Sequence, residues 1–384
     1  MRETNAGAAA TSLRSTPPPR LLIVTGQHFA TQPRRVDLHF MADALVRRGV
    51  PVDFLSVRLS LLSKLARDDR WGFARTRRWN RWNRIGPLQE EYIWFRLVHA
   101  ARTRSPMLNR WSAGIEQGAA IPPAVRARLT GYSDILVESG AALFLLPRLR
   151  RLAPQARIIY HAADRLETIG AHPRLGGILR DHAGDIDLVH VVAEALRSEV
   201  PHQQVVYLPH GLSKEAFAAV DAPSPFAGSR NAVCVGDMLF DADAVETMAR
   251  AFPDWTFHLF GRKARTGSAL PNVVAHGERP FDEIAGYIRH ADIGLAPYLD
   301  ERDADYISQS SMKMIQYSYM QLPIVAPAFA AAGRDHVCAY TPGNPESIVA
   351  AFERATRFDR ARIDQDGILS WDEKVARLFP AAGR

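Results

Sequence analysis

Short and almost continuous apolar runs recur along the first half of this chain, separated by stretches that include helical spacing. Such runs, without polar alternation, are typical of parallel strands that are covered on both faces. Residues 36–48, between the first two runs, have helical spacing and end at Gly49. The first half therefore predicts a doubly wound α/β domain. Its expected strands are residues 21–25, 52–57, 134–138, 157–161, 188–192 and 205–208.

The second half starts the same pattern again, after a stretch rich in Pro, Gly and Ser at residues 221–229. A chain of 384 residues is too long for one ordinary core and fits two domains of roughly 150–200 residues. We therefore expect an α/β protein with two Rossmann-like domains joined by a hinge. The expected strands of the second domain are residues 232–236, 256–260, 272–275, 293–296, 323–326 and 338–340.

These patterns divide the chain into five parts. Residues 1–19 are rich in Ala, Ser, Thr and Pro and lack a hydrophobic signal core, so we expect a disordered arm. The first Rossmann-like domain is expected at residues 20–215 and the linker at 216–230. The second domain is expected at residues 231–362. Residues 363–384 are expected to form a C-terminal helix that packs back across the domains.

Composition and motifs exclude several classes of protein. There is no apolar run of about 18 residues, so no transmembrane helix is expected. The only two cysteines, Cys234 and Cys338, each lie inside an apolar run, which indicates reduced core residues of a cytoplasmic protein rather than a disulfide or zinc framework. The chain has no G-x-G-x-x-G, no Walker A motif and no metal-ligand spacing, which argues against dehydrogenases and P-loop enzymes.

Positive charge is concentrated in one block of the first half. The chain carries a net charge of +7, and residues 64–104 contain eleven Lys or Arg against four acids, interleaved with Trp, Phe and Tyr. Cations and indoles at this density suit an anionic membrane surface. A single-stranded nucleic acid and a solvated face over a partly buried aromatic seam are the alternatives, and we expect no nucleic-acid partner. The expected membrane-facing residues are Arg77, Arg78, Trp79, Arg81 and Trp82.

A polar loop, a short helix and a buried strand follow one another at residues 308–327. Lys313 lies near the expected start of the helix, with Gln316 and Tyr317 on the same face. Free backbone N–H groups, the positive end of the helix dipole and a Lys together form a site for a phosphorylated ligand. On this segment alone, a surface helix with a solvated Lys is the favoured interpretation.

The C-terminal half resembles the nucleotide-sugar domain of the GT-B glycosyltransferases. The resemblance rests on residues 277–298, on Lys313-x-x-Gln316-Tyr317 and on the strand at Pro323. Apart from the N-terminal arm, the whole chain resembles the GumK family of glucuronosyltransferases. This resemblance implies two Rossmann-like domains facing across a cleft.

The family also implies an activity and a location. It transfers glucuronate, with inversion, from UDP-glucuronate to a mannose on a polyprenyl-diphosphate-linked oligosaccharide in xanthan-type exopolysaccharide biosynthesis. It implies a peripheral, monotopic enzyme at the cytoplasmic face of the bacterial inner membrane. No cofactor and no metal are expected, because in GT-B enzymes a cation and a helix dipole stabilise the leaving diphosphate. Asp303-Ala-Asp305 has the spacing of a metal motif but lies among polar residues.

The resemblance gives roles to several residues of the second domain. Lys313 is expected to contact the diphosphate. Gln316 is expected to bind the ribose hydroxyls, although many relatives have a Glu there, so the bond would lack charge assistance. The remaining donor-binding candidates each have a plainer alternative: a core Tyr, a surface carboxylate, or Met as apolar filler. They are Tyr298 for the uracil or the sugar, Glu278 for the nucleotide, and Met238 and Met312 for the base pocket.

Two residues of the first domain are candidates for acceptor chemistry. Asp164 follows the expected strand at 157–161, where a carboxylate points to the edge at which α/β proteins bind ligands. It is our candidate for the base that deprotonates the acceptor hydroxyl, with a helix N-cap as the alternative role. His28 follows the first strand and is expected either to bind an acceptor hydroxyl or simply to end the strand. No residue for the glucuronate carboxylate is identified; Arg262, Lys263 and Arg265 are near in sequence only.

Other functions remain compatible with the same sequence. A GT-B transferase that uses another nucleotide sugar, such as GDP-mannose, would differ in its response to UDP and GDP. A UDP-sugar epimerase would have no use for a lipid-facing block. A non-catalytic assembly subunit with a decayed nucleotide site is suggested by Gln316, whereas the presence of both Lys313 and Asp164 argues against it.

Overall fold

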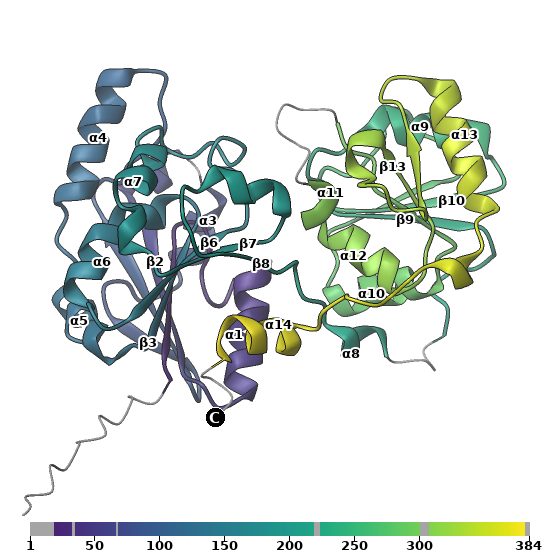
Figure 1. The fold of residues 1–384 in the computed structure, drawn as a ribbon. Helices are drawn as coiled ribbons and strands as arrows, with labels where there is room; N and C mark the ends of the chain where they lie inside the picture. The colour runs from purple at the N-terminus through teal and green to yellow at the C-terminus, as the bar shows by residue number, and fades with distance from the viewer. Residues whose placement is uncertain (1–18, 33–34, 67, 219–222, 300–306, 381–384) are drawn as a thin grey trace, which may run out of the picture.

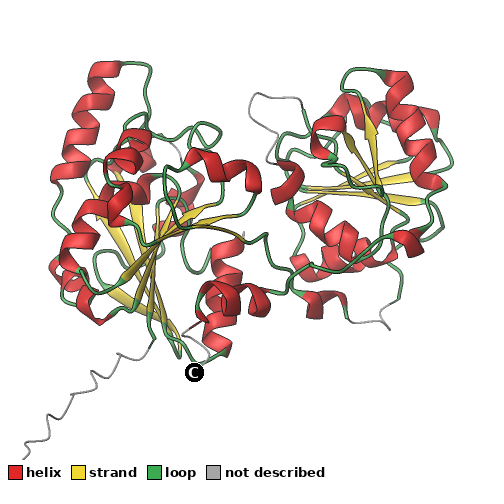
Figure 2. Ribbon diagram, in the orientation of Figure 1, coloured by secondary structure: helices red, strands yellow, loops and turns green. Residues whose placement is uncertain are grey.

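The structure is a computed structural model that describes residues 19–32, 35–66, 68–218, 223–299 and 307–380. Its elements form two α/β lobes, each with a central sheet between helices (Figures 1 and 2). Among the described residues, no helix is both long enough and apolar enough to cross a bilayer. Each strand expected from an apolar run is present, with its ends shifted by up to three residues.

The first lobe contains an eight-stranded sheet in the order β3-β4-β2-β1-β5-β6-β7-β8. All neighbouring strands are parallel except the antiparallel pair β3 and β4. The strands that form this sheet are β1 (Leu21–Thr25), β2 (Val52–Ser60), β3 (Trp82–Gly86), β4 (Gln89–Arg96), β5 (Asp134–Glu138), β6 (Arg157–Ala162), β7 (Leu188–Val191) and β8 (Val205–Tyr207).

Helices cover both faces of this sheet, as the unbroken apolar runs require. The basic, aromatic block forms α2, α3 and the β3–β4 hairpin, which extends the sheet at one edge. The helices of this lobe are α1 (Asp37–Arg47), α2 (Leu61–Leu65), α3 (Asp69–Ala74), α4 (Pro106–Gly118), α5 (Pro123–Arg126), α6 (Leu146–Leu152) and α7 (Leu175–Asp181).

The second lobe contains a six-stranded, fully parallel sheet in the order β11-β10-β9-β12-β13-β14. Its strands are β9 (Asn231–Val235), β10 (Thr256–Phe260), β11 (Val273–Gly277), β12 (Ile293–Leu295), β13 (Ile324–Pro327) and β14 (Val337–Tyr340). The helices between and around them are α8 (Lys214–Phe217), α9 (Ala242–Ala251), α10 (Phe281–His290), α11 (Ile307–Ser310), α12 (Met312–Tyr319) and α13 (Pro345–Thr356).

The C-terminal helix is shorter than the sequence pattern predicts. Helix α14 spans Trp371–Leu378, because Gly367 adopts a left-handed φ of +81° in the preceding turn and Ser370 caps the helix with Glu373. From the second lobe the chain returns to the first, where α14 packs on α1 (Figure 1). The Trp371 ring stacks on Phe40 with the centroids 5.3 Å apart.

The lobes also touch beside α11 and α12. The Gln309 side-chain oxygen accepts a hydrogen bond of 2.5 Å from the Glu194 backbone N–H of the first lobe. Met312, at the start of α12, packs against the apolar cluster around α1 and α14. The N-terminal end of α12 is therefore adjacent to the first lobe.

Candidate functional site

In each sheet the strand order reverses direction at one point, and the loops there are the natural place for a ligand. In the second lobe this point lies between β9 and β12, and in the first between β1 and β5. The loops that leave these four strands begin at Gly236, Ala296, Gly26 and Ser139. We therefore built the candidate site from these two strand edges.

Lys313 is a buried cation at the strand-reversal point of the second lobe. Only 9% of the residue is exposed, and its Nζ lies 3.4 Å from the Gly236 carbonyl oxygen and 4.8 Å from the centroid of the Tyr298 ring. Burial by itself lowers the pKa of Lys313, but Tyr298, Cys234 and Asp237 more than offset this and raise it. The side chain thus remains an ammonium ion in the folded protein.

A set of hydrogen bonds fixes the start of α12 against the strand ends. Ser311 is the N-cap, and its Oγ lies 2.6 Å from the Tyr298 hydroxyl. Deeper in the helix, the Tyr317 hydroxyl accepts from the Val235 N–H at 2.9 Å and donates to the Val233 carbonyl at 3.0 Å. These contacts hold the free amides of the first turn of α12 beside the end of β9.

Glycine is required where the Tyr317 ring crosses β12. A Cβ at Gly294 would lie 2.4 Å from that ring. Any side chain at position 294 would therefore displace Tyr317 and with it the whole of α12. The loop after β9 is equally tight, since Gly236 has a φ of +83° and a Cβ at Gly261 would lie 2.9 Å from Asp237.

The other predicted donor residues are placed differently by the structure. Tyr298 is 1% exposed and its hydroxyl is engaged with Ser311. Its ring therefore packs against Lys313 and is not exposed for stacking on the uracil. Gln316 is buried, and its side-chain amide has no hydrogen-bond partner among the described residues. Met238 is 51% exposed on the loop after β9. Glu278 is exposed and forms an ion pair with Arg262 at 3.2 Å.

His28 lies at the edge of the first sheet, beside a carboxylate that the sequence analysis did not select. Its Nε2 lies 3.2 Å from Glu138 Oε1, and its Nδ1 lies 3.0 Å from the Gln32 amide nitrogen. The other oxygen of Glu138 accepts from the Thr25 hydroxyl at 2.5 Å. Burial lowers the pKa of His28, but Glu138 outweighs it and raises the pKa. Glu138 ends an expected strand, so the argument that selected Asp164 would also have selected it.

Asp164 lies two residues beyond the end of β6 and is half-buried. The next helix, α7, begins only at Leu175 and has Arg174 at its N-cap position. The N-cap role considered for Asp164 is therefore wrong, because the chain forms turns, not a helix, directly after it. Its carboxylate is close enough to contribute to raising the pKa of the buried Tyr160, after the larger effects of burial and Glu167.

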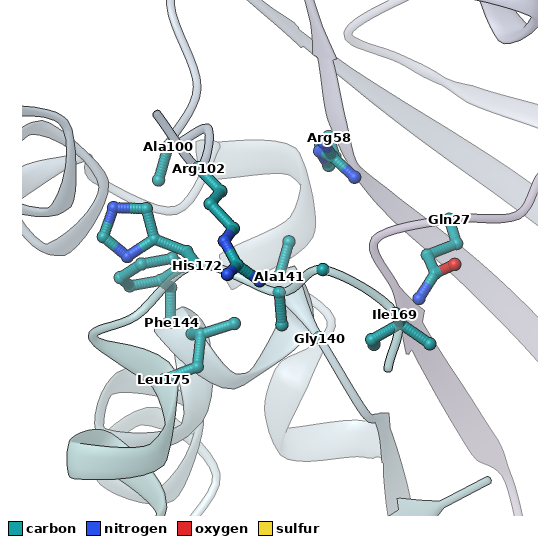
Figure 3. Close-up of a pocket in the computed structure, with 12 residues that line it drawn as sticks. Gln27, Arg58, Ala100, Arg102, Gly140, Ala141, Phe144, Ile169, His172 and Leu175 are labelled. Carbon is teal, nitrogen blue, oxygen red and sulfur yellow. The ribbon is translucent and has the colours of Figure 1, made fainter. Parts of the chain in front are cut away.

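A small, open pocket lies at the strand-reversal point of the first lobe, and its volume of about 370 Å³ includes space that is open to solvent. Gln27, from the loop after β1, and Arg58, from β2, come from one side, and Arg102, Phe144 and His172 from the other (Figure 3). None of these five residues was selected from the sequence. Arg58 follows an expected strand, and this position is the signal that could have identified it.

The five residues expected to face a membrane divide into two groups. Arg77, Arg78 and Arg81 are exposed. Trp79 is half-buried and stacks on Phe95 at 4.5 Å between centroids. Trp82 packs against Tyr92 at 5.3 Å, and the Arg128 guanidinium covers its ring. The two indoles therefore stabilise the β3–β4 hairpin, and only the arginines project into solvent.

The metal motif considered at Asp303 and Asp305 lies outside the described residues. Within the part of the chain that the structure describes, no group of three or more His, Cys, Asp or Glu is arranged to hold a metal ion.

Comparison with known proteins gives matches over both lobes. Residues 23–192 match the family "Glucuronosyltransferase GumK, N-terminal domain", and residues 229–357 match "Glycosyl transferases group 1". The chain is 33% identical over 371 residues to the UDP-glucuronate:glycolipid 2-beta-glucuronosyltransferase of Xanthomonas campestris pv. campestris, covering 94% of this chain and 89% of the relative.

Solved structures support the fold alone. A UDP-forming α,α-trehalose-phosphate synthase from Burkholderia xenovorans has a TM-score of 0.60 at 13% identity, over 95% of this chain and 97% of its own. The glycotransferase of kitacinnamycin has a TM-score of 0.55 at 14% identity, over 96% of this chain and 100% of its own. The fold is thus that of the GT-B glycosyltransferases.

Proposed function

The chain belongs to the GumK glucuronosyltransferase family, and we propose that it moves glucuronate from UDP-glucuronate to the mannose of a polyprenyl-diphosphate-linked oligosaccharide in xanthan-type exopolysaccharide biosynthesis. The observation that carries the proposal is the buried ammonium of Lys313 at the strand-reversal point of the second lobe. The start of α12, which holds Lys313, is also adjacent to the first lobe, where an acceptor would bind.

On the donor side, Lys313 and the free amides of the first turn of α12 bind the diphosphate of the donor. An ammonium ion held in a largely buried position stabilises the charge that develops on the leaving UDP. The helix dipole adds to this field, so no metal ion is proposed. Gln316, whose amide has no partner among the described residues, binds the ribose hydroxyls.

On the acceptor side, the carboxylate of Asp164 takes the proton from the mannose hydroxyl as its oxygen attacks the anomeric carbon. The new glycosidic bond forms while the bond between the sugar and UDP breaks, and the proton remains on Asp164. A single displacement of this kind inverts the anomeric configuration. His28, fixed by Glu138, orients the acceptor sugar.

The acceptor carries a polyprenyl chain, so the enzyme works at a membrane surface. We propose that it binds peripherally to the cytoplasmic face of the inner membrane. The exposed Arg77, Arg78 and Arg81 support this, because clustered basic residues attract anionic headgroups.

The proposal is tested with the purified chain, labelled UDP-glucuronate and a lipid-linked acceptor that ends in mannose. We expect a lipid-bound product with a β-linked glucuronate, and inhibition by UDP but not by GDP. Inhibition by GDP alone would point to another nucleotide sugar. Tight UDP binding without turnover on any mannose-terminated acceptor would instead favour an assembly subunit with an inactive nucleotide site.

A further inference from the structure

The pocket of the first lobe has a tightly built floor. A Cβ at Gly26 would lie 2.7 Å from Ala141, so the loops after β1 and β5 are in direct contact there. Gly140 has a φ of +110°, and a Cβ on it would lie 3.4 Å from the amide nitrogen of Gln27. A side chain at either glycine would press against the opposite side of the pocket, so both glycines leave space there for a ligand. Polar and apolar side chains are mixed around the pocket: Ile169 lies near Gln27, and Arg102 lies near Phe144 and Leu175 (Figure 3).

Two guanidinium groups in this pocket have no partner. Neither Arg58 nor Arg102 forms a hydrogen bond or an ion pair with any other residue of the described ranges, and the Gln27 amide has no side-chain partner there either. Arg58 is half-buried, whereas Arg102 is exposed. Burial, followed by the nearby Arg70, lowers the pKa of Arg58, and Asp68 and Glu116 offset this only in part. No carboxylate of the described residues lies within ion-pair distance of Arg58, so its charge is compensated only in part, and this arrangement is suited to an anion supplied from outside.

The neighbouring cations differ from Arg58 because each has a partner within the protein. Arg70 forms an ion pair with Asp68, and Arg96 donates to Glu116 at 2.6 Å. The imidazole of His172 is also engaged, since its Nε2 lies 3.1 Å from the Asn109 carbonyl oxygen and its Nδ1 accepts from the Arg174 N–H at 3.1 Å. His172 therefore forms part of the wall and leaves the arginines as the groups available to an anion.

The backbone places both arginines specifically. The pairing of β2 with β4 shifts register between Ser56 and Leu59, and such a bulge redirects the side chain of Arg58. The loop that carries Arg102 is held by the buried carboxylate of Glu116, which accepts from the Ala100 N–H at 2.9 Å. Two independent local features thus bring the unpaired guanidinium groups to one pocket.

Exposed apolar side chains gather in segments that lie close in the chain to Arg58, Ala100 and Arg102, which line this pocket. Six of the nine large hydrophobic residues that are exposed in the described ranges belong to α2, to the chain after β4 or to α4. Helix α4 is tied to the pocket wall through the contact between Asn109 and His172. Exposed apolar side chains of this kind are suited to contact with the hydrocarbon chain of a lipid. The six residues are Leu61, Leu65, Leu97, Met107, Leu108 and Trp111.

We infer that this pocket binds the phosphoryl group through which the acceptor glycan is joined to its lipid, with the hydrocarbon chain lying along these exposed apolar side chains. The inference deepens the proposed function and rests on it. Guanidinium groups match phosphate oxygens in a planar, bidentate geometry, and the Gln27 amide adds a neutral donor. Because His28 follows Gln27 in the chain, a glycan that leaves the phosphoryl group extends from the pocket toward the His28–Glu138 pair.

The first test measures binding of geranyl diphosphate to the full chain by calorimetry, with saturating UDP present to occupy the donor site. We expect Arg58→Gln and Arg102→Gln each to weaken binding by about 10- to 100-fold, the loss expected for a hydrogen bond to a charged group. Arg104→Gln, an exposed cation of the same loop that does not line the pocket, should leave binding unchanged. Equal affinities in all four proteins would overturn the inference.

Thermal unfolding separates a binding role from a structural one. Because Arg58 has no hydrogen bond or ion pair to lose among the described residues, Arg58→Gln should melt at or above the temperature of the parent while its affinity falls. A lower melting temperature with unchanged affinity would instead make Arg58 a structural residue.

The phosphoryl group could also come from bulk anionic lipid, and acceptor kinetics distinguish the two sources. With a soluble, short-chain alkyl diphosphate glycan and no vesicles, Arg58→Gln should raise the acceptor KM while kcat changes little. With an alkyl mannoside that lacks phosphate, variant and parent should behave alike. An effect seen only with phosphatidylglycerol vesicles would overturn the inference. If no acceptor is turned over, the proposed function fails, whereas the geranyl diphosphate titration still decides whether the pocket binds phosphoryl lipids.

Discussion

The carboxylate of Asp37 lies 2.7 Å from His161 Nε2, which joins the first turn of α1 to the strand that leads to Asp164. His161 Nδ1 in turn lies 2.8 Å from His190 Nδ1, and His190 Nε2 donates to the Leu208 carbonyl at 3.1 Å. Burial keeps His190 neutral by lowering its pKa, so its Nδ1 accepts a hydrogen bond from His161. His161 therefore has a hydrogen-bond acceptor at each ring nitrogen, Asp37 at Nε2 and His190 at Nδ1.

Asp37→Asn is expected to destabilise the fold. Burial would raise the pKa of Asp37, but His161, His210 and Lys374 hold it well below its ordinary value. Removing the carboxylate leaves buried positive charge without a partner, a change that typically costs about 3–5 kcal/mol. Urea unfolding at neutral pH measures the loss. An unfolding free energy equal to that of the parent would show that the carboxylate contributes nothing.

Lys374→Met is the matched variant, and its effect should have the opposite sign. Burial lowers the pKa of Lys374 to about 8, so the Lys374 amine binds its proton less tightly in the folded protein than in the unfolded chain. Between about pH 8 and pH 10.5 the unfolded chain therefore holds the extra proton, and stability rises with pH. The variant should be as stable as the parent at neutral pH, or more stable, and should lack this alkaline rise. A marked loss of stability would contradict the prediction.

The buried histidines predict a steep loss of stability in mild acid. Burial lowers the pKa of His99 and of His210 to about 3 and that of His190 well below its ordinary value. Because the unfolded chain takes up these protons from about pH 6.5 downward and the folded protein does not, each histidine costs about 1.4 kcal/mol at about pH 5.5. Urea unfolding at about pH 7.5 and pH 5.5 tests this by giving the free energy of unfolding at each pH. His99→Asn should reduce the loss between the two pH values by about 1.4 kcal/mol.

Most strands of both sheets were predictable because buried parallel strands have unbroken apolar runs. The β3–β4 hairpin was not predicted, because its exposed edge position allows Arg84 and Asn83 to interrupt the pattern. The predicted helix at 363–384 proved shorter, since a turn at Gly367 separates it from the preceding segment.

The candidate site was predictable only where one short segment contains the signal. Lys313 was found because it lies at the start of a helix that precedes a buried strand. Glu138 acts with His28, which is more than a hundred residues away in the chain, and no local pattern records that contact. The same applies to Asp37 and His161, and to Arg58 and Arg102, which meet only in the folded pocket.

Lys313→Met is expected to weaken UDP binding and to slow transfer together. The Met side chain retains the apolar stem but removes the charge that stabilises the diphosphate in both the ground state and the transition state. A lost charge-assisted bond predicts a fall in UDP affinity of about 10- to 100-fold, measured by calorimetry. Tyr298→Phe, which keeps the ring below Lys313, should have a much smaller effect. Unchanged UDP affinity in Lys313→Met would remove this residue from the donor site.

The arginines and tryptophans of the basic block should respond differently to substitution. Replacing Arg77, Arg78 and Arg81 together by Ser should weaken the free energy of binding to anionic vesicles by about 1 kcal/mol per charge. Vesicle sedimentation measures this loss, and the melting temperature should not change. Trp79→Ser should lower the melting temperature, because its ring stacks on Phe95. If the triple variant binds vesicles as well as the parent does, another surface carries the membrane contact.

Asp164→Asn is expected to reduce turnover by about 10²- to 10⁴-fold, the usual contribution of a positioned general base. The amide retains the size and hydrogen-bonding capacity of the side chain, but it cannot take the proton of the attacking hydroxyl. UDP affinity should be unchanged, because Asp164 belongs to the first lobe and Lys313 to the second. His28→Gln serves as the comparison: it should raise the acceptor KM more than it lowers kcat, since it removes an orienting group. Near-normal kcat in Asp164→Asn would transfer the role of base to the His28–Glu138 pair, and a pH–rate profile of each variant would then identify which group titrates with activity.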